Sequence, residues 1–284
     1  MHDPAVSARG ANAARTYPTP TALCSSYMQT QSRDEIVRRI DVARREEGNG
    51  VLAFDGDGTL WSGDVGEDFF HAMVARDRFE PSATLELKRI AAEHRLDTAG
   101  DGAALARRLY EEYLEQRFPE IGICELMAWG CAGWGLSELG AFAVEVANKS
   151  ALPARFHTEA VSVLAWAQKA GIEVFLVSAS PRAIVLEAAK AVGVDAAHVV
   201  AATPLLDGTT LLPTVDRPIP YGPGKVTRLR ERIGDRPLYA AFGDNVFDLP
   251  MLNEAKVGVA VRPKPRLLER AHEAPGIVEI LRLP

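Results

Sequence analysis

The 284-residue chain has only three cysteines, Cys24, Cys124 and Cys131, and no CxxC pair. An odd and widely spaced set argues against a disulfide framework and against a structural zinc site, and it suits a reducing compartment. The six histidines are scattered as well, and none stands at metal-ligand spacing from another. We therefore expect a cytoplasmic location.

Long apolar runs and an excess of positive charge are also missing. No run approaches the ~20 residues that a membrane helix needs, so we expect no membrane span. A net charge of −6 gives no electrostatic footprint for nucleic acid. With 47% hydrophobic and 25% charged residues, the composition is that of an ordinary globular protein of one large or two smaller domains. The oligomeric state stays open.

The first 33 residues have no hydrophobic periodicity and are rich in Ala, Ser, Thr and Pro. They lack the apolar core of a secretory signal, so we expect residues 1–33 to be a disordered tail. Met28 is a second candidate for the native start of translation.

Two kinds of pattern divide the rest of the chain. Short buried strands alternate with helices in most of it, which predicts a parallel α/β sheet with covered faces. Residues 64–151 instead read as helices without a strong strand, so we expect a helical insertion after the first strand, with a core of residues 34–63 and 152–284. The expected strands are 51–54, 172–177, 198–202, 238–242 and 257–261, and the expected helices are 36–45, 161–169, 182–192, 225–232, 248–254 and a closing stretch. A hairpin is expected around Asp207-Gly208.

Three of these strands end in polar groups. The sequence DGDGT (55–59) follows the first, Ser178-Ala-Ser180-Pro181 the second, and Gly243-Asp-Asn245 the strand at 238–242. Ligands of open α/β sheets bind past the carboxyl ends of strands, so we expect these groups to meet. Ser180 and Pro181 suit the N-cap and first position of a helix, which also presents N–H groups to an anion.

Each group has an ordinary explanation when taken alone. DGDGT could be a turn or part of a calcium loop, but Leu60 and Gly66 stand where an EF-hand needs Gly and Glu. YGPGKVT is not a P-loop, because Ile219 and Val226 replace the required Gly and Ser/Thr. Asp244 and Asp248 could simply cap a helix, and Lys225 could be a solvated lysine.

In this order, the groups resemble the four motifs of the haloacid dehalogenase-like superfamily, most closely its phosphoserine-phosphatase-like branch. The resemblance covers about residues 36–265: DGDGT is the first motif, Ser178 the second, Lys225 the third, and Gly243-Asp-Asn245 with Asp248 the fourth. It implies a Rossmann-like parallel-sheet core with a helical C1-type cap at 64–151.

The resemblance also implies roles for these residues. Asp55 would attack phosphorus and form an aspartyl-phosphate, and Asp57 would protonate the leaving oxygen and later activate water. Mg²⁺ would be held by the Asp55 carboxylate, the Asp57 carbonyl and Asp244. The remaining assignments are Lys225, Ser178, Ala179 and Thr59 around the phosphate, with Thr59 also bracing the loop, and Asn245 and Asp248 as supporting residues that position Lys225 or a metal-bound water.

These roles imply a Mg²⁺-dependent phosphatase acting on a small-molecule phosphate ester. Dehalogenases and ion-pumping ATPases of the superfamily lack an acid at the position of Asp57. The alternatives are a phosphotransferase or mutase, and a non-catalytic metal-binding member. The substrate is expected to be phosphoserine or an amine-bearing phosphate such as phosphocholine.

The segment after the first motif is the expected source of specificity. Trp61, Asp64 and Glu67 are the candidates, since an acidic cluster beside an aromatic ring accepts an ammonium group. Phosphoserine phosphatases carry a glutamate at the position of Asp64. The alternative is that Asp64, Glu67 and Asp68 only begin a helix. Further candidates are Trp129 and Trp134, as a cage or as core, and Arg76, Arg78 and Arg117, as partners of a substrate carboxylate.

Overall fold

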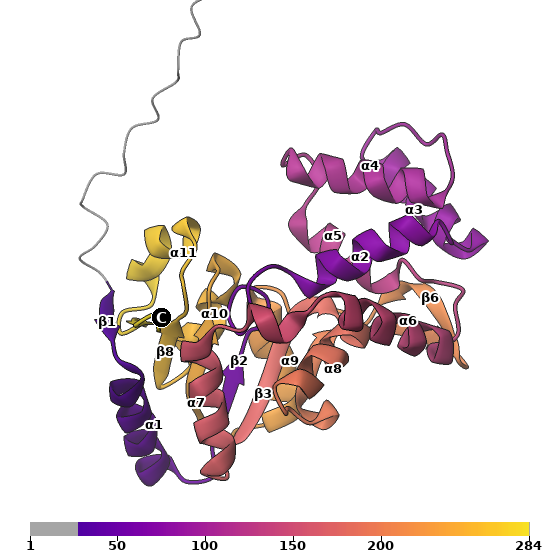
Figure 1. Cartoon of the computed structure of the whole chain (residues 1–284). Helices are drawn as coiled ribbons and strands as arrows, with labels where there is room; N and C mark the ends of the chain where they lie inside the picture. Colours follow the sequence, from indigo (N-terminus) through magenta and orange to yellow (C-terminus); the bar gives the residue numbers. More distant parts are fainter. Residues whose placement is uncertain (1–27, 284) are drawn as a thin grey trace, which may run out of the picture.

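The computed structural model describes residues 28–283, and residues 1–27 of the expected tail lie outside this range. Seven parallel strands form the central sheet, in the order β1-β9-β8-β7-β2-β3-β4. Figure 1 labels four of them, β1, β8, β2 and β3, across the sheet. The strands are β1 (Gln29–Gln31), β2 (Val51–Phe54), β3 (Glu173–Pro181), β4 (Val199–Ala202), β7 (Leu238–Gly243), β8 (Val257–Ala260) and β9 (Val278–Ile280). The predicted α/β class with a Rossmann-like parallel sheet is therefore confirmed.

Helices cover both faces of this sheet. Leu52 and Phe54 of β2 pack into one buried cluster with α1 (Arg33–Glu47), α7 (Thr158–Lys169) and α8 (Arg182–Ala191). Val51 and Ala53 point the other way, toward α9 (Pro223–Ile233), α10 (Leu249–Glu254) and α11 (Pro265–Arg270). A strand buried on both faces needs a continuous apolar run, which is why VLAF has no polar alternation.

The chain changes direction at β2. From β2 it continues to β3 and β4 on one side of the sheet, and it later returns to β7 and β8 on the other side of β2. The loops that follow β2 and β7 therefore diverge at the carboxyl ends of these adjacent strands. Open parallel sheets bind their ligands at such a point.

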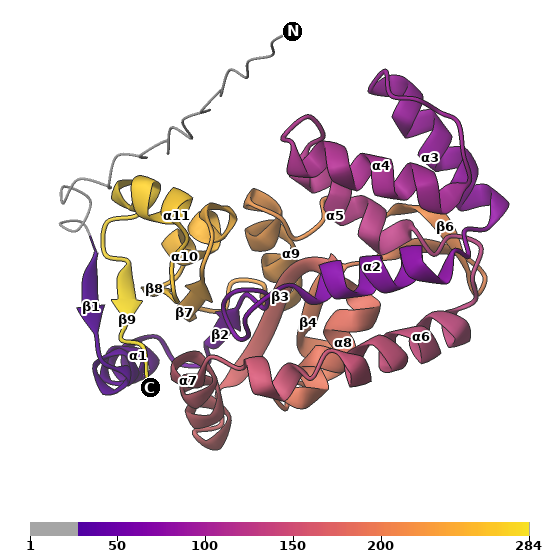
Figure 2. The same cartoon turned by 45° about the horizontal axis from the view of Figure 1, so that its top comes forward.

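A helical layer stands over this edge (Figure 2). It consists of α2 (Val65–Arg76), α3 (Pro81–Glu93), α4 (Gly102–Leu114), α5 (Glu120–Trp129) and α6 (Leu136–Lys149). The hairpin of β5 (Pro204–Asp207) and β6 (Thr210–Val215) forms as predicted around Asp207-Gly208 and packs against α5. Its Leu211 N–H donates to the Trp134 carbonyl, so this hairpin packs against the helical layer, which we call the cap. Within residues 28–283, no helix is both long and apolar enough for a membrane span.

Two short strands, β1 at the edge of the sheet and β9 beside it, correct the sequence prediction. β1 lies inside the expected disordered tail, and β9 lies in what was expected to be a closing helical stretch. Both are three residues long, and they pair with each other through main-chain groups. A short edge strand such as QTQ needs only those main-chain bonds and leaves no hydrophobic signature in the sequence.

A buried ion pair fixes the loop after β8. Glu159, on the first turn of α7, is fully buried and accepts a hydrogen bond from Arg262 Nε at 2.7 Å. Arg262 has a positive φ of 45°, which is strained for a non-glycine residue. Burial is the largest single influence and would raise the pKa of Glu159, but the hydrogen bond from Arg262, a main-chain hydrogen bond and the charge of Arg262 together lower the pKa.

We expect Glu159→Gln to lower the free energy of unfolding at pH 7 by about 1–3 kcal/mol. A lowered carboxyl pKa contributes stability above the ordinary value of 4.5, and this contribution is lost as the pH falls through the folded-state pKa. The difference between wild type and variant should therefore shrink as urea titrations move from pH 7 to pH 3. Glu187→Gln, which removes the partner of the exposed Lys190, is the control and should show almost no difference at either pH. A pH-independent loss in Glu159→Gln would contradict the assignment.

Candidate active site

Asp55 follows β2 directly and is held from two sides. Its side chain is only 8% exposed. One carboxylate oxygen, Oδ1, lies 2.6 Å from Lys225 Nζ, and the other, Oδ2, accepts a hydrogen bond from the Thr59 hydroxyl at 2.9 Å. Thr59 is fully buried, so the structure supports its predicted bracing role. Its contact with phosphate stays a prediction.

Asp248 organises the second loop, after β7. Its Oδ2 accepts hydrogen bonds from the main-chain N–H groups of Asp244 at 3.0 Å and Asn245 at 2.9 Å. Its Oδ1 lies 2.5 Å from Lys225 Nζ. Both oxygens are thus engaged in positioning the loop and the lysine, in line with the supporting role expected for Asp248. The side chain of Asn245 caps the following turn through the Val246 N–H.

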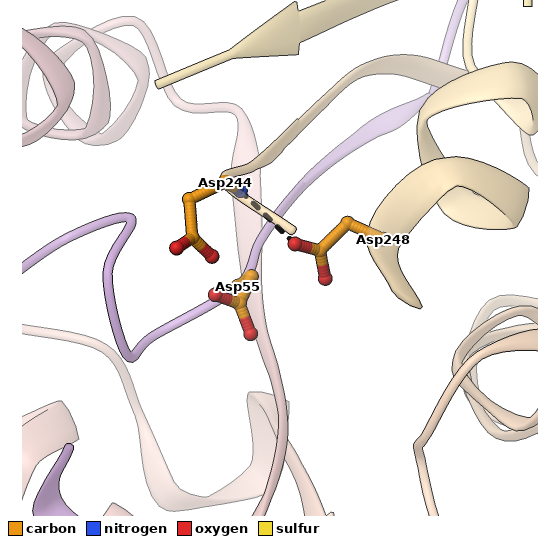
Figure 3. Close-up of side chains that lie close together, drawn as sticks. All are labelled: Asp55, Asp244 and Asp248. Atoms are coloured by element: carbon orange, nitrogen blue, oxygen red, sulfur yellow. Dashed lines mark hydrogen bonds between the residues drawn. The ribbon is translucent and has the colours of Figure 1, made fainter. Parts of the chain in front are cut away.

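The carboxylates of Asp55, Asp244 and Asp248 come together beyond the ends of β2 and β7, and one oxygen of each lies within 4.8 Å of one oxygen of the other two (Figure 3). Burial raises the pKa of Asp55 well above its ordinary value, and the charge of Asp248 adds to the effect. The same causes raise the pKa of Asp244 to about 6. Burial alone would lower the pKa of Lys225, but the charges of Asp248 and Asp55 outweigh it and raise the pKa. The three carboxylates therefore carry more negative charge than Lys225 alone offsets.

These groups fit a divalent cation. Carboxylate and carbonyl oxygens are the ligands that Mg²⁺ prefers. Gly58 leaves room beside Asp244, because a Cβ at this position would lie 2.1 Å from Asp244 Oδ2, and its φ of +82° also favours glycine. Asp55, Asp244 and the main chain at Asp57 are the residues that would hold the ion.

Lys264 is a site residue that the sequence prediction missed. It follows β8, and its Nζ lies 2.9 Å from Asp244 Oδ2. The position of Lys264 could have been predicted, because it follows the strand expected at 257–261, and the carboxyl end of that strand lies at the same edge of the sheet as Asp55 and Asp244.

The side chain of Asp57 is held by three donors. Its Oδ1 accepts hydrogen bonds from Trp61 Nε1 and from the Val65 N–H, both at 2.7 Å, and its Oδ2 accepts one from Ser180 Oγ at 2.7 Å. This corrects the predicted cap: the N-cap of α8 is Pro181, so Ser180 serves Asp57 in place of the helix start. Ser178 lies close by, with its hydroxyl 3.5 Å from Asp57 Oδ2.

A cavity of about 500 Å³ opens over these groups. Asp55, Asp57, Lys225 and Asp244 line its floor together with Ser178, Ala179 and Ser180 at the end of β3. Carboxylates and aromatic rings line its walls: Asp64, Glu67, Tyr113 and Glu120 come from the cap, and Tyr221 and Phe247 come from the core. The structure thus brings the four predicted motifs together in one cavity, and it adds Tyr113, Glu120, Tyr221 and Phe247, which the sequence did not single out.

Asp64 and Glu67 serve two roles at once. Asp64 is the N-cap of α2 and accepts a hydrogen bond from the Glu67 N–H at 2.9 Å, so the expected helix start is present. Both side chains also line the cavity, and Glu67 accepts a hydrogen bond from the Tyr110 hydroxyl. Burial, and after it the charge of Asp57, raises the pKa of Asp64 well above its ordinary value. Asp68 pairs with Arg155 at 2.5 Å.

The other aromatic and cationic candidates do not line this cavity. Trp61 is fully buried against the first loop, so the structure gives it a positioning role toward Asp57 and not the predicted contact with substrate. Trp129 and Trp134 are buried in the hydrophobic interior. The three arginines form ion pairs with cap glutamates: Arg76 with Glu145, Arg78 with Glu80 and Glu138, and Arg117 with Glu112 and Glu115.

Comparisons with known proteins show the family and the fold of the chain. Residues 52–253 match the family model of the haloacid dehalogenase-like hydrolases. A solved structure of a protein of unknown function from Bordetella pertussis Tohama I is 25% identical, with a TM-score of 0.61 over 81% of this chain and 97% of that one. A functionally unknown protein from Anaerococcus prevotii is 15% identical, with a TM-score of 0.61 over 89% and 93% of the chains. A HAD family hydrolase from Salmonella enterica serovar Typhi is 14% identical, with a TM-score of 0.52 over 88% and 77%. No curated protein matches the sequence significantly.

Proposed function

The chain belongs to the haloacid dehalogenase-like hydrolases, and from that premise we propose that it is a Mg²⁺-dependent phosphatase of small-molecule phosphomonoesters. One observation carries the proposal. Asp55 and Asp57 line the same cavity, and Asp55 is paired there with a lysine that Asp248 holds in place. This arrangement supplies a nucleophile, a proton-transfer group and a fixed positive charge.

Each residue has a step in the reaction. An Asp55 oxygen attacks phosphorus, the bond between phosphorus and the leaving oxygen breaks, and Asp57 gives that oxygen its proton. Asp57 then takes a proton from the water that attacks the aspartyl-phosphate, which regenerates Asp55 and releases inorganic phosphate. Lys225 offsets the negative charge on Asp55 and the phosphoryl group, and Ser178 with the main chain at Ala179 binds phosphoryl oxygens. Bound Mg²⁺ would add electrostatic stabilisation of the phosphoryl group.

The cavity walls support an amine-bearing substrate, with phosphoserine and phosphocholine as examples. Asp64, Glu67 and Glu120 place three carboxylates there, beside the aromatic rings of Tyr113 and Tyr221. Carboxylates with aromatic faces suit an ammonium or quaternary amine. Arg76, Arg78 and Arg117, which were predicted to bind a substrate carboxylate, form ion pairs elsewhere in the cap. The carboxylates and aromatic rings of the cavity wall therefore favour a leaving group with positive charge.

The test is a panel of phosphate esters assayed for phosphate release with and without Mg²⁺: p-nitrophenyl phosphate, phosphoserine, phosphocholine, phosphoethanolamine and sugar phosphates. We expect Mg²⁺-dependent release from the aryl phosphate, and higher kcat/KM for the amine-bearing esters than for sugar phosphates. Transfer of labelled phosphate to an added alcohol in preference to water would favour a phosphotransferase. No turnover of any ester by folded protein would overturn the proposal and favour a non-catalytic metal-binding role.

A further inference from the structure

Two lysines reach the carboxylate cluster, and their surroundings differ sharply. The side chain of Lys225 is 5% exposed and bonds to both Asp55 and Asp248. The side chain of Lys264 is 53% exposed and pairs with Asp244 alone. Lys225 is therefore a fixed part of the site, whereas Lys264 can leave for solvent without burying its charge.

The main chain keeps Lys264 beside Asp244. The Lys264 N–H donates to the Asp244 carbonyl at 2.8 Å, and the Val261 N–H donates to the Gly243 carbonyl at 2.8 Å. Between them, Arg262 is tied to the buried Glu159. Because three contacts anchor this short loop, the approach of the ammonium to Asp244 is built into the fold and is not the chance position of a surface side chain.

The contact falls on a carboxylate that the proposed metal ion would need. Asp244 Oδ2 is the atom that Lys264 Nζ meets, and it is also the atom against which Gly58 packs closely. The charges of Asp55 and Asp248 act on the same ammonium. Lys264 therefore supplies positive charge to the cluster at the place where the proposed dication would supply it.

We propose that Lys264 is an internal counterion of Asp244 that gives up this carboxylate when a divalent cation binds, and that it thereby sets the metal affinity of the site. The inference rests on the proposed metal site. Displacement of one unit positive charge opposes binding of the dication, while the half-exposed side chain gives the ammonium a hydrated position to move to. Lys264 is a positioning residue in this scheme, because it acts through Asp244.

Metal affinity is the first measurement. Calorimetric titration of Lys264→Met with Mg²⁺ should give a Kd about tenfold lower than that of wild type, because the competing charge is gone. Lys264→Arg keeps the charge and should restore the weaker binding. The matched control is Lys256→Met: Lys256 is also 53% exposed and pairs with a glutamate, Glu47, and its variant should bind Mg²⁺ like wild type.

Displacement itself is the second measurement, and it needs no turnover. The wild-type protein is labelled with an amine-reactive reagent with and without saturating Mg²⁺, and modification of Lys264 and Lys256 is followed by peptide mass spectrometry. We expect Mg²⁺ to accelerate labelling of Lys264 and to leave Lys256 unchanged.

Two results would overturn the inference while leaving the phosphatase proposal intact: equal Mg²⁺ affinity in Lys264→Met and wild type, or labelling of Lys264 that Mg²⁺ does not accelerate. Failure of both wild type and Lys264→Met to bind Mg²⁺ would overturn the metal site as well. Tight binding by Lys264→Met alone would support the inference.

Discussion

Asp55→Asn is expected to lower kcat for p-nitrophenyl phosphate by at least about 10⁴-fold, with the fold intact. An amide oxygen does not form a stable ester with phosphorus, so no other group in the site replaces the nucleophile. The substitution is nearly isosteric. Its amide oxygen can still accept from Lys225, and the Thr59 hydroxyl can rotate to accept from the new NH₂ group. Removing one of three crowded carboxylates also lessens their repulsion, so we expect no loss of thermal stability.

The measurement should follow the intermediate as well as the rate. Wild type is expected to give a phosphorylated peptide containing Asp55 after acid quench, and to bind beryllofluoride in the presence of Mg²⁺. The variant should do neither. Asp216→Asn is the control, since Asp216 is an exposed carboxylate that pairs with Arg228. More than a tenth of wild-type activity in Asp55→Asn, with deamidation excluded by mass, would show that another group attacks phosphorus.

The sequence predicted the centre of this site because strand ends determine it. Asp55 follows β2, Ser178 lies near the end of β3, and Asp244 follows β7. In a parallel sheet these ends share one edge, so short buried runs followed by polar residues were enough to bring the motifs together. The order β4-β3-β2-β7 then places the first and fourth motifs on adjacent strands.

The ends of the strands do not predict which residues line the walls of the cavity. Trp61 was expected at the substrate and is fully buried instead, because its indole nitrogen finds Asp57 in the same loop. Glu120 lines the cavity from a cap segment that carries no motif, and Tyr221 lines it from four residues before Lys225, where no pattern marked it. The packing of the cap on the core brings the two into one cavity. Periodicity describes single elements, so it cannot show which faces of two distant elements meet.

Asp57→Asn is expected to show a loss that depends on the leaving group. The variant retains the local contacts, since the amide oxygen can accept from Trp61 and Val65 while its NH₂ group donates to the Ser180 hydroxyl. What it loses is proton transfer. An alkyl alkoxide is a poor leaving group without a proton, so we expect kcat/KM for alkyl phosphates to fall by about 10²–10⁴-fold.

Aryl phosphates should respond differently to the same substitution. Nitrophenolate leaves without protonation, so Asp55 should still be phosphorylated quickly, whereas hydrolysis of the aspartyl-phosphate lacks its base. Rapid mixing should therefore give a nitrophenolate burst equal to the enzyme concentration, then slow turnover with phosphorylated Asp55 accumulating. Ser180→Ala is the matched control, because it removes a hydrogen bond to Asp57 but keeps the carboxylate, and it should show no burst. Equal losses on aryl and alkyl esters without a burst would mean that Asp57 supports the loop structurally and transfers no proton, since only proton transfer separates the two leaving groups.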